Sequence, residues 1–91
     1  MNHNTQGFSY KQITASGNIC GIDGILGGIY CSSTTAGTVT IFDDPATGTA
    51  TKLLDTTTLE VGWNPMPFAF SKGLNIVVGG TLSATVGFIS G

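Results

Sequence analysis

Residues 27–44 read GGIYCSSTTAGTVTIFDD, and this stretch decides the fold class that the sequence predicts. Two runs of β-branched and aromatic residues flank a small polar connector that ends in glycine, which is the pattern of a β-hairpin. Paired residues of an antiparallel ladder point to the same side of the sheet. Placing Ile29 opposite Ile41 satisfies this rule, and it predicts Ser33–Gly37 as a five-residue loop.

Short strand signals recur along the rest of the chain, whereas every window with helical spacing contains a glycine or a cluster of β-branched residues. The predicted strands are Phe8–Ile13, Gly24–Ser32, Gly37–Asp43, Ala50–Asp55, Pro67–Phe70, Gly73–Val78 and Leu82–Ile89, with a minor strand over Leu59–Trp63. This spacing predicts an all-β fold, namely a single antiparallel β-sandwich (jelly-roll-like) of about seven to eight short strands. A small barrel is the alternative.

A second hairpin is predicted around Gly79-Gly80. A two-residue turn at these glycines would place Ile76 opposite Ser83, which breaks the match of apolar with apolar positions. Including Thr81 in the loop places Ile76 opposite Ala84 instead. The sequence therefore predicts a three-residue loop with a glycine in the left-handed region.

The strand over Gly24–Ser32 has apolar residues on both faces. Strict alternation sets Leu26 and Tyr30 on one face, and Ile25 and Ile29 on the other. This pattern predicts a central strand, or a strand whose outer face is covered by another subunit. The pair Gly27-Gly28 within it predicts a bulge or a close approach of another backbone.

The chain has 91 residues, which is the size of one domain with one thin core. Only 9 % of the residues are charged, so solubility has to come from uncharged polar groups such as threonine. Three scattered lysines cannot form the basic patch that nucleic acid or an anionic membrane surface requires, so we expect neither as a partner. No apolar run approaches the ~20 residues of a membrane span.

We divide the chain into a polar N-terminal arm, residues 1–7, and a β-sandwich domain, residues 8–91. The arm reads MNHNTQG and has neither a basic segment nor an apolar one, so we expect no signal peptide and a protein made in a cytoplasm. The arm is either a frayed terminus or a segment that becomes ordered on a neighbouring subunit.

Residues 63–68, WNPMPF, are predicted as a loop with large apolar side chains. An exposed tryptophan beside prolines is a plausible anchor of an interface, and the alternative is that Trp63 and Phe68 cap the open end of the sandwich. Together with the residues that follow the arm, this loop supplies the predicted interface residues. These are Phe8, Tyr10, Trp63, Met66 and Phe68.

Residues that carry catalysis or bind metals are scarce. His3 is the one histidine and lies in the polar arm, so serine and cysteine lack a positioned general base. Asp43-Asp44 precede a proline, where aspartate commonly caps a turn, and calcium would need six or more oxygen ligands. We therefore predict no enzyme, no cofactor and no metal site. Cys20 and Cys31 are predicted to be free, buried thiols, with a disulfide as the alternative.

The order of short motifs along the chain resembles that of a known family. An apolar strand is followed by GTVTIFD (residues 37–43), TGT (47–49), PFAFSKGL (67–74), GG (79–80) and a closing ATV (84–86). This sequence looks like the small glycine- and threonine-rich β-proteins that tailed bacteriophages and prophages encode. The likeness covers about Gly24 to Ile89, and Phe88 stands where the family tends to have tyrosine.

The resemblance implies a β-sandwich protein of the virion, assembled in the host cytoplasm, and not an enzyme. Within that class it implies a capsid decoration or cement protein that bridges and stabilises major capsid subunits. The implied partners are the major capsid protein or other virion proteins, and further copies of this chain, with a trimer as one option. The alternative is a tail, neck or fibre module in which Tyr10, Tyr30 and Trp63 bind a host glycan.

Overall fold

A computed structural model describes residues 9–90, so the predicted arm and Phe8 lie outside the described residues. Residues 9–90 form six β-strands and no helix. The strands are β1 (Ser9–Ile13), β2 (Gly17–Cys20), β3 (Gly24–Phe42), β4 (Lys52–Thr58), β5 (Gly62–Phe70) and β6 (Leu74–Ser90). The predicted all-β class is confirmed.

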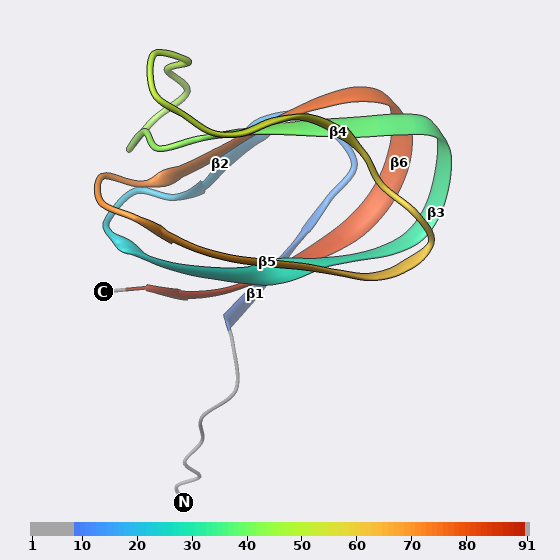
Figure 1. The fold of residues 1–91 in the computed structure, drawn as a ribbon, viewed down its shortest axis with the longest axis horizontal. Helices are drawn as coiled ribbons and strands as arrows, with labels where there is room; N and C mark the ends of the chain where they lie inside the picture. The colour runs from blue at the N-terminus through green and yellow to red at the C-terminus, as the bar shows by residue number, and fades with distance from the viewer. Residues whose placement is uncertain (1–8, 91) are drawn as a thin grey trace, which may run out of the picture.

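The six strands form one antiparallel sheet that folds over on itself into two layers (Figure 1). Its centre is the pair of long strands β3 and β6, whose pairing runs from Gly24 with Ser90 to Phe42 with Asn75. Both long strands bend midway. The first layer consists of β5, the first half of β3, the second half of β6, and β1. The second layer consists of β4, the second half of β3, the first half of β6, and β2.

The core lies between the two layers and follows from the alternation of the two long strands. Successive side chains of a strand point to opposite faces, so every second residue of β3 and β6 enters the core on either side of the bend. Burying one such aliphatic side chain contributes about 1.5–3 kcal/mol relative to leaving it in water. The completely buried core residues of these strands are Leu26, Ile29, Cys31, Val39, Ile41, Leu74, Ile76 and Val86.

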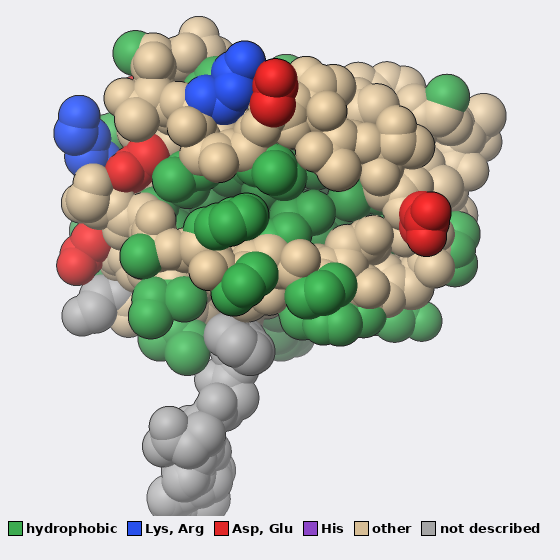
Figure 2. All heavy atoms as spheres, in the orientation of Figure 1, with side chains coloured by type: hydrophobic (Ala, Val, Ile, Leu, Met, Phe, Trp, Pro, Cys, Tyr) green, Lys and Arg blue, Asp and Glu red, His purple; other side chains and the backbone are tan. Residues whose placement is uncertain are grey.

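One side of the sandwich, between β4 and β5, exposes hydrophobic side chains (Figure 2). These two strands are edges, because among the described strands each pairs with β3 alone. Leu53 and Leu54 of β4 are half-buried and pack against the core, and Phe68 of β5 is 37 % exposed. We call the surface formed by Leu53, Leu54 and Phe68 the seam.

The hairpin predicted at Ser33–Gly37 does not exist, because β3 bends there and continues. Ile29 pairs with Val86, and Ile41 pairs with Ile76. All four side chains point into the core, so the predicted pairing and the real one satisfy the face rule equally well. Alternation decides which face a residue occupies, and it does not decide which strand lies beside it.

The hairpin predicted at Gly79-Gly80 is also absent, because β6 bends there and continues. Ile76 pairs with Ile41 across the sheet. The bend of β6 lies opposite the bend of β3, where Thr35 pairs with Thr81. The turn-forming residues therefore mark a bend that two paired strands share. The predicted glycine in the left-handed region is confirmed at Gly80, whose φ is 69°.

The predicted bulge in the first half of β3 is confirmed by a register shift between Leu26 and Gly28. The extra residue reverses the alternation, so Leu26 and Ile29 both point into the core. Ile25 and Tyr30 point outward and are about half exposed. The prediction that Leu26 shares a face with Tyr30 is therefore wrong. The central position of this strand is confirmed, because β3 lies between β5 and β6.

The segment over residues 63–68, predicted as a loop, is a strand. It lies within β5 (Gly62–Phe70). Proline is tolerated in β5 because the outer side of an edge strand needs no N–H donor. The prolines of this segment led to the prediction of a loop, because proline occurs both in loops and in edge strands.

The six strands of residues 9–90 form two triplets with the same arrangement. The short strands β1 and β2 flank β6, and the short strands β4 and β5 flank β3. Because β3 and β6 are antiparallel, a twofold relation exchanges the triplets and the layers. Ile25 pairs with Ile89 in the first layer as Asn75 pairs with Phe42 in the second. Ile25 is therefore equivalent to Asn75, and Ile89 to Phe42.

Candidate protein interface

The loop between β3 and β4 begins with a buried carboxylate. Asp43 accepts hydrogen bonds from the backbone N–H groups of Ser71 (3.0 Å), Lys72 (2.8 Å) and Gly73 (3.2 Å), and from the Ser71 hydroxyl (2.8 Å). Burial would raise the pKa of Asp43, but these hydrogen bonds outweigh it and lower the pKa to about 2. The carboxylate therefore locks the start of the loop to the connection between β5 and β6.

The rest of this loop lies over the outer face of the second layer. The Nδ2 group of Asn18 donates to the carbonyl oxygen of Ala46 (2.6 Å), and that of Asn75 donates to the carbonyl oxygen of Gly48 (3.1 Å). Phe42 and Asn75 point outward from the sheet, yet they are only 7 % and 2 % exposed. The loop thus covers one end of this outer face.

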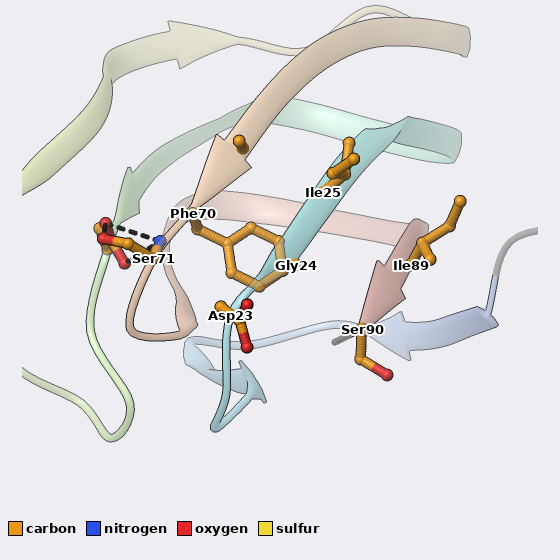
Figure 3. Close-up of a pocket in the computed structure, with 9 residues that line it drawn as sticks. Asp23, Gly24, Ile25, Phe70, Ser71, Ile89 and Ser90 are labelled. Carbon is orange, nitrogen blue, oxygen red and sulfur yellow. Dashed lines mark hydrogen bonds between the residues drawn. The ribbon is translucent and has the colours of Figure 1, made fainter.

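The equivalent end of the first layer has no covering loop within residues 9–90. There Ile25 and Ile89 are 50 % and 44 % exposed. A hollow of about 470 Å³ lies beside them, where the start of β3 meets the ends of β5 and β6 (Figure 3). Its apolar walls come from Ile25, Ala69, Phe70 and Ile89. The hollow suits apolar contact more than polar chemistry.

The hollow also carries polar groups. Of its two carboxylates, Asp23 and Asp43, the second is already bonded to the loop that begins at Ser71. Asp44 also caps a turn, because its Oδ1 accepts the backbone N–H groups of Ala46 (2.8 Å) and Gly48 (3.0 Å). The interpretation as a cap of the turn at Pro45 is confirmed for Asp44, whereas Asp43 bonds to the connection between β5 and β6. Within residues 9–90, no group of three or more His, Cys, Asp or Glu side chains is placed to hold a metal ion.

The outer face of the first layer carries large exposed hydrophobic side chains. We call it the aromatic face and define it by Tyr10, Ile25, Tyr30, Trp63 and Ile89. Tyr30 lies directly opposite Trp63 on the neighbouring strand. The Trp63 ring lies against Gly28, where a Cβ atom would come within 2.7 Å of the ring. Glycine at this position lets the ring rest on the backbone, which fixes the orientation of a half-exposed tryptophan.

The outer face of the second layer carries small hydroxyl side chains outside the covered end. We call it the threonine face and define it by Thr38, Thr40, Thr56 and Thr58. Thr38 lies opposite Thr58, and the hydroxyls of Thr40 and Thr56 are hydrogen-bonded at 2.7 Å. Val77, opposite Thr40, is the one large hydrophobic residue exposed among these described positions, at 37 %. This face is suited to solvent.

The predicted interface residues fall in different places. Tyr10 (77 % exposed) and Trp63 (50 %) lie on the aromatic face, and Phe68 (37 %) lies at the seam. Met66 is 6 % exposed and belongs to the core, so its side chain offers no contact surface. Phe8 lies outside the described residues. Trp63 does not cap an open end of the sandwich, because it points outward from the sheet.

Sequence reasoning missed two residues of the aromatic face, Ile25 and Ile89. A usable signal was present, because the strand over Gly24–Ser32 is apolar on both faces. The bulge at Gly27-Gly28 hid which of these apolar residues face outward. Ile89 belongs to a strand that alternates well, and its outward position follows from that alternation alone.

Cys20 and Cys31 are free and buried, as predicted. The Cys31 thiol lies 3.3 Å from the carbonyl oxygen of Ser33, and the Cys20 thiol lies 3.4 Å from that of Ile22. Both therefore act as small packing residues with a satisfied S–H group.

Comparisons with known proteins provide no relative. No family model, no curated protein and no solved structure matches this chain. The part of the chain from residue 9 to residue 90 also contains no helix long and apolar enough to cross a membrane. The function has to be inferred from the surfaces and motifs of the chain itself.

Proposed function

We propose that this protein is a structural protein of the bacteriophage virion, most specifically a capsid decoration protein that bridges major capsid subunits. The observation that carries the proposal is the presence of two apolar surfaces on different sides of a small sandwich, the aromatic face and the seam. Exposed patches of this kind mark sites of protein association. A bridging protein needs two such surfaces, because it contacts two partners at once.

The resemblance in sequence supports the same class, since its motifs cover both long strands and the connection before β6. The low charge of the chain is also consistent with it. With only 9 % charged residues, contacts have to rest on buried apolar area and hydrogen bonds. We expect such binding to depend weakly on salt, in contrast to binding that relies on ion pairs.

The mechanism is stabilisation by area burial. A specific contact buries about 800 Å² on each partner, and a protein attached to two neighbouring subunits resists their separation. Many weak contacts act together when every copy is bound to the same shell. The protein contributes a rigid, pleated surface and no chemical step.

The test uses heads of the encoding phage prepared without this chain. We expect the purified protein to sediment with the heads, to saturate at a copy number that matches the capsomer symmetry, and to raise the temperature at which the heads rupture. Phe68→Thr at the seam should weaken this binding, whereas Thr58→Ala on the threonine face should leave it unchanged. Heads that bind none of the protein at any concentration would refute the decoration role.

A tail, neck or fibre module with a glycan site is the second candidate. The favouring observation is the fixed, half-exposed ring of Trp63 beside Tyr30, because a flat aromatic surface can stack on the apolar face of a sugar. The test is binding of host-surface polysaccharide to the purified protein. Binding that Trp63→Ala abolishes, and that the control Val77→Ala retains, would support this candidate over the first.

A further inference from the structure

We propose that the aromatic face binds a second copy of this chain, so that the protein is a twofold dimer packed face to face through its first layer. The inference rests on the proposed function only in treating this face as an interface. It assigns a second copy as the partner across that face, so that the two surfaces of the dimer that contact capsid subunits are the seams of its two copies.

The internal twofold relation of the fold indicates that this face lacks a cover among the described residues, 9–90. At the covered end of the second layer, Phe42 and Asn75 lie beneath the loop between β3 and β4. Among residues 9–90, no loop covers the equivalent residues of the first layer, Ile89 and Ile25, which are 44 % and 50 % exposed. The uncovered end is thus also the more hydrophobic one. Leaving it in water costs free energy that a contact would recover.

The side chains at the equivalent ends of the two layers differ, and this difference indicates what kind of group would cover the first layer. Asn75 bonds to a backbone carbonyl of the covering loop, which an amide side chain can do. Ile25, at the equivalent position, has no polar atom to offer. Its environment is therefore completed by apolar side chains and not by backbone. The aromatic face itself is a surface of that kind.

Among residues 9–90, the outward strand positions of the aromatic face carry no charged side chain, which favours pairing of the face with itself, and Asp23 lies at its end beside the hollow. In a twofold contact each residue meets the same patch of the partner, so a charge near the axis would face its own copy. The outward positions between its large residues are polar but uncharged, small, or proline. They are Gln12, Gly28, Pro65, Ala69, Thr85 and Gly87.

The relief of the face suits the packing of one sheet on another. Trp63, Tyr30 and Thr85 lie in one row across the strands, and Ala69, Ile25 and Ile89 lie in a second row. Between these rows Gly87 has no side chain, and Tyr10 stands beside it at the edge of the layer, 77 % exposed. Two such faces can interdigitate at the separation of about 10 Å that is usual for packed sheets.

The area of the face meets the requirement of a dimer. A large aromatic side chain offers about 150–250 Å² when fully exposed, so Tyr10, Tyr30 and Trp63 at their observed exposures supply about 350 Å². Ile25, Ile89 and the small residues between them bring the total above about 600 Å². This reaches the lower range of specific interfaces, about 600–800 Å² on each partner.

The test is sedimentation equilibrium of the purified full chain at ~1 to ~100 µM, without phage components. We expect a monomer–dimer equilibrium for the natural sequence. Tyr30→Lys places a charge at the centre of the face and should raise the dissociation constant at least ~10-fold. The matched control Val77→Lys places the same charge at an outward position of the second layer, where Val77 is also exposed, and should leave the dimer intact.

Tyr30→Thr serves as the second variant, because threonine suits a central strand and removes the ring without adding charge. Both variants are compared at equal fraction folded by circular dichroism. A natural chain that stays monomeric throughout the concentration range would overturn the inference, and so would a trimer or a dimer that Tyr30→Lys leaves unaffected. A monomer that still saturates heads would leave the proposed function standing. A dimer of the expected kind that ignores heads would leave the inference standing alone.

Discussion

The two layers have the same arrangement of paired strands, but their outer faces carry opposite kinds of side chain. The second layer is covered at one end by the loop between β3 and β4, and elsewhere its outward side chains are mainly threonines. The first layer exposes five large hydrophobic side chains and a hollow at the equivalent end. Because the twofold relation matches the strands pair by pair, the difference lies in the side chains and in one loop.

This difference shows that a loop of the chain covers one half of a duplicated arrangement, while no loop within residues 9–90 covers the other half. Asp43 and the two asparagines Asn18 and Asn75 hold the loop by hydrogen bonds, so the covered end is specified by polar residues. No equivalent set occurs among the described residues around Ile25 and Ile89. The open end is specified by apolar residues, which fits closure by another molecule.

The largest expected effect comes from breaking the covered end at Asp43. Asp43→Asn keeps the shape of the side chain but turns an amide N–H₂ group toward the N–H donors of Ser71–Gly73. We expect a loss of about 2–4 kcal/mol in the free energy of unfolding, measured with urea at pH 7. Asp55→Asn is the control, because Asp55 is an exposed partner of Lys52. A loss of unfolding free energy no larger than that of the control would show that the hydrogen bonds of Asp43 contribute little to stability.

The same carboxylate makes stability depend on pH. The pKa of Asp43 is about 2 in the folded protein, against an ordinary value of 3.8, so the folded state favours the charged form. The stabilisation is complete above about pH 5 and is lost as the pH falls through the folded pKa toward 2. It amounts to about 2 kcal/mol, and Asp43→Asn should lose this acid dependence.

Substitutions at two glycines test the aromatic face and leave the hydrogen bonds of Asp43 unchanged. A Cβ atom at Gly28 would meet the carbonyl oxygen of Asn64 at 2.6 Å and the Trp63 ring at 2.7 Å. At Gly79 it would meet the hydroxyl of Thr38 at 2.6 Å, and that side chain can rotate away. We expect Gly28→Ala to cost about 1–3 kcal/mol and Gly79→Ala less.

The fluorescence of Trp63, the one tryptophan of the chain, separates the local effect from general destabilisation. In folded Gly28→Ala the ring has to leave the backbone, so the emission maximum should move to longer wavelength. Gly79→Ala should keep the natural spectrum. Equal spectra for both variants would mean that Gly28 does not set the position of the ring.

Weakening the attachment of the loop between β3 and β4 should expose the end of the second layer that this loop covers. Asn75→Ala removes the hydrogen bond to the carbonyl oxygen of Gly48 and leaves that oxygen near a small apolar group. We expect a loss of about 1–2 kcal/mol and faster hydrogen exchange in residues 44–51. Gln12→Ala, at an exposed outward position of the first layer, should change neither quantity. Unchanged exchange in the loop would indicate that other contacts hold it.

The sequence predicts the fold class and most faces correctly, because these depend on local alternation. The alternation at Ala84, Val86 and Phe88 in β6 can be read from the sequence, and the predicted bulge beside Gly28 is present. The partners of the strands are not predictable in this way. Ile29 and Ile41 both point into the core, so pairing them with each other or with Val86 and Ile76 satisfies the same rule.

The candidate interface is predictable only in part for a related reason. Tyr10 and Trp63 stand out as large side chains in otherwise polar or proline-containing segments. Ile25 does not, because an outward isoleucine and an inward one look the same until the bulge is placed. The covering loop depends on contacts between residues 18, 46, 48 and 75, which are far apart in the chain. No local pattern reveals such contacts.

The smallest expected effect concerns the threonine face, where the hydroxyls of Thr40 and Thr56 are hydrogen-bonded across two strands. Replacing both by valine keeps the shape of the face but makes it hydrophobic. A double-mutant cycle should give a coupling of about 0.5 kcal/mol, because the pair is exposed and water replaces the lost bond.

The variant with valine at both positions also gives the second layer an apolar patch like that of the first. If exposed apolar area alone caused association, this variant would form larger assemblies than the natural chain in sedimentation equilibrium. We expect it not to do so, because the patch is small and the loop still covers the end that would have to complete the contact. Association of the valine variant as strong as that through the aromatic face would show that hydrophobicity, and not the relief of the first layer, selects the interface.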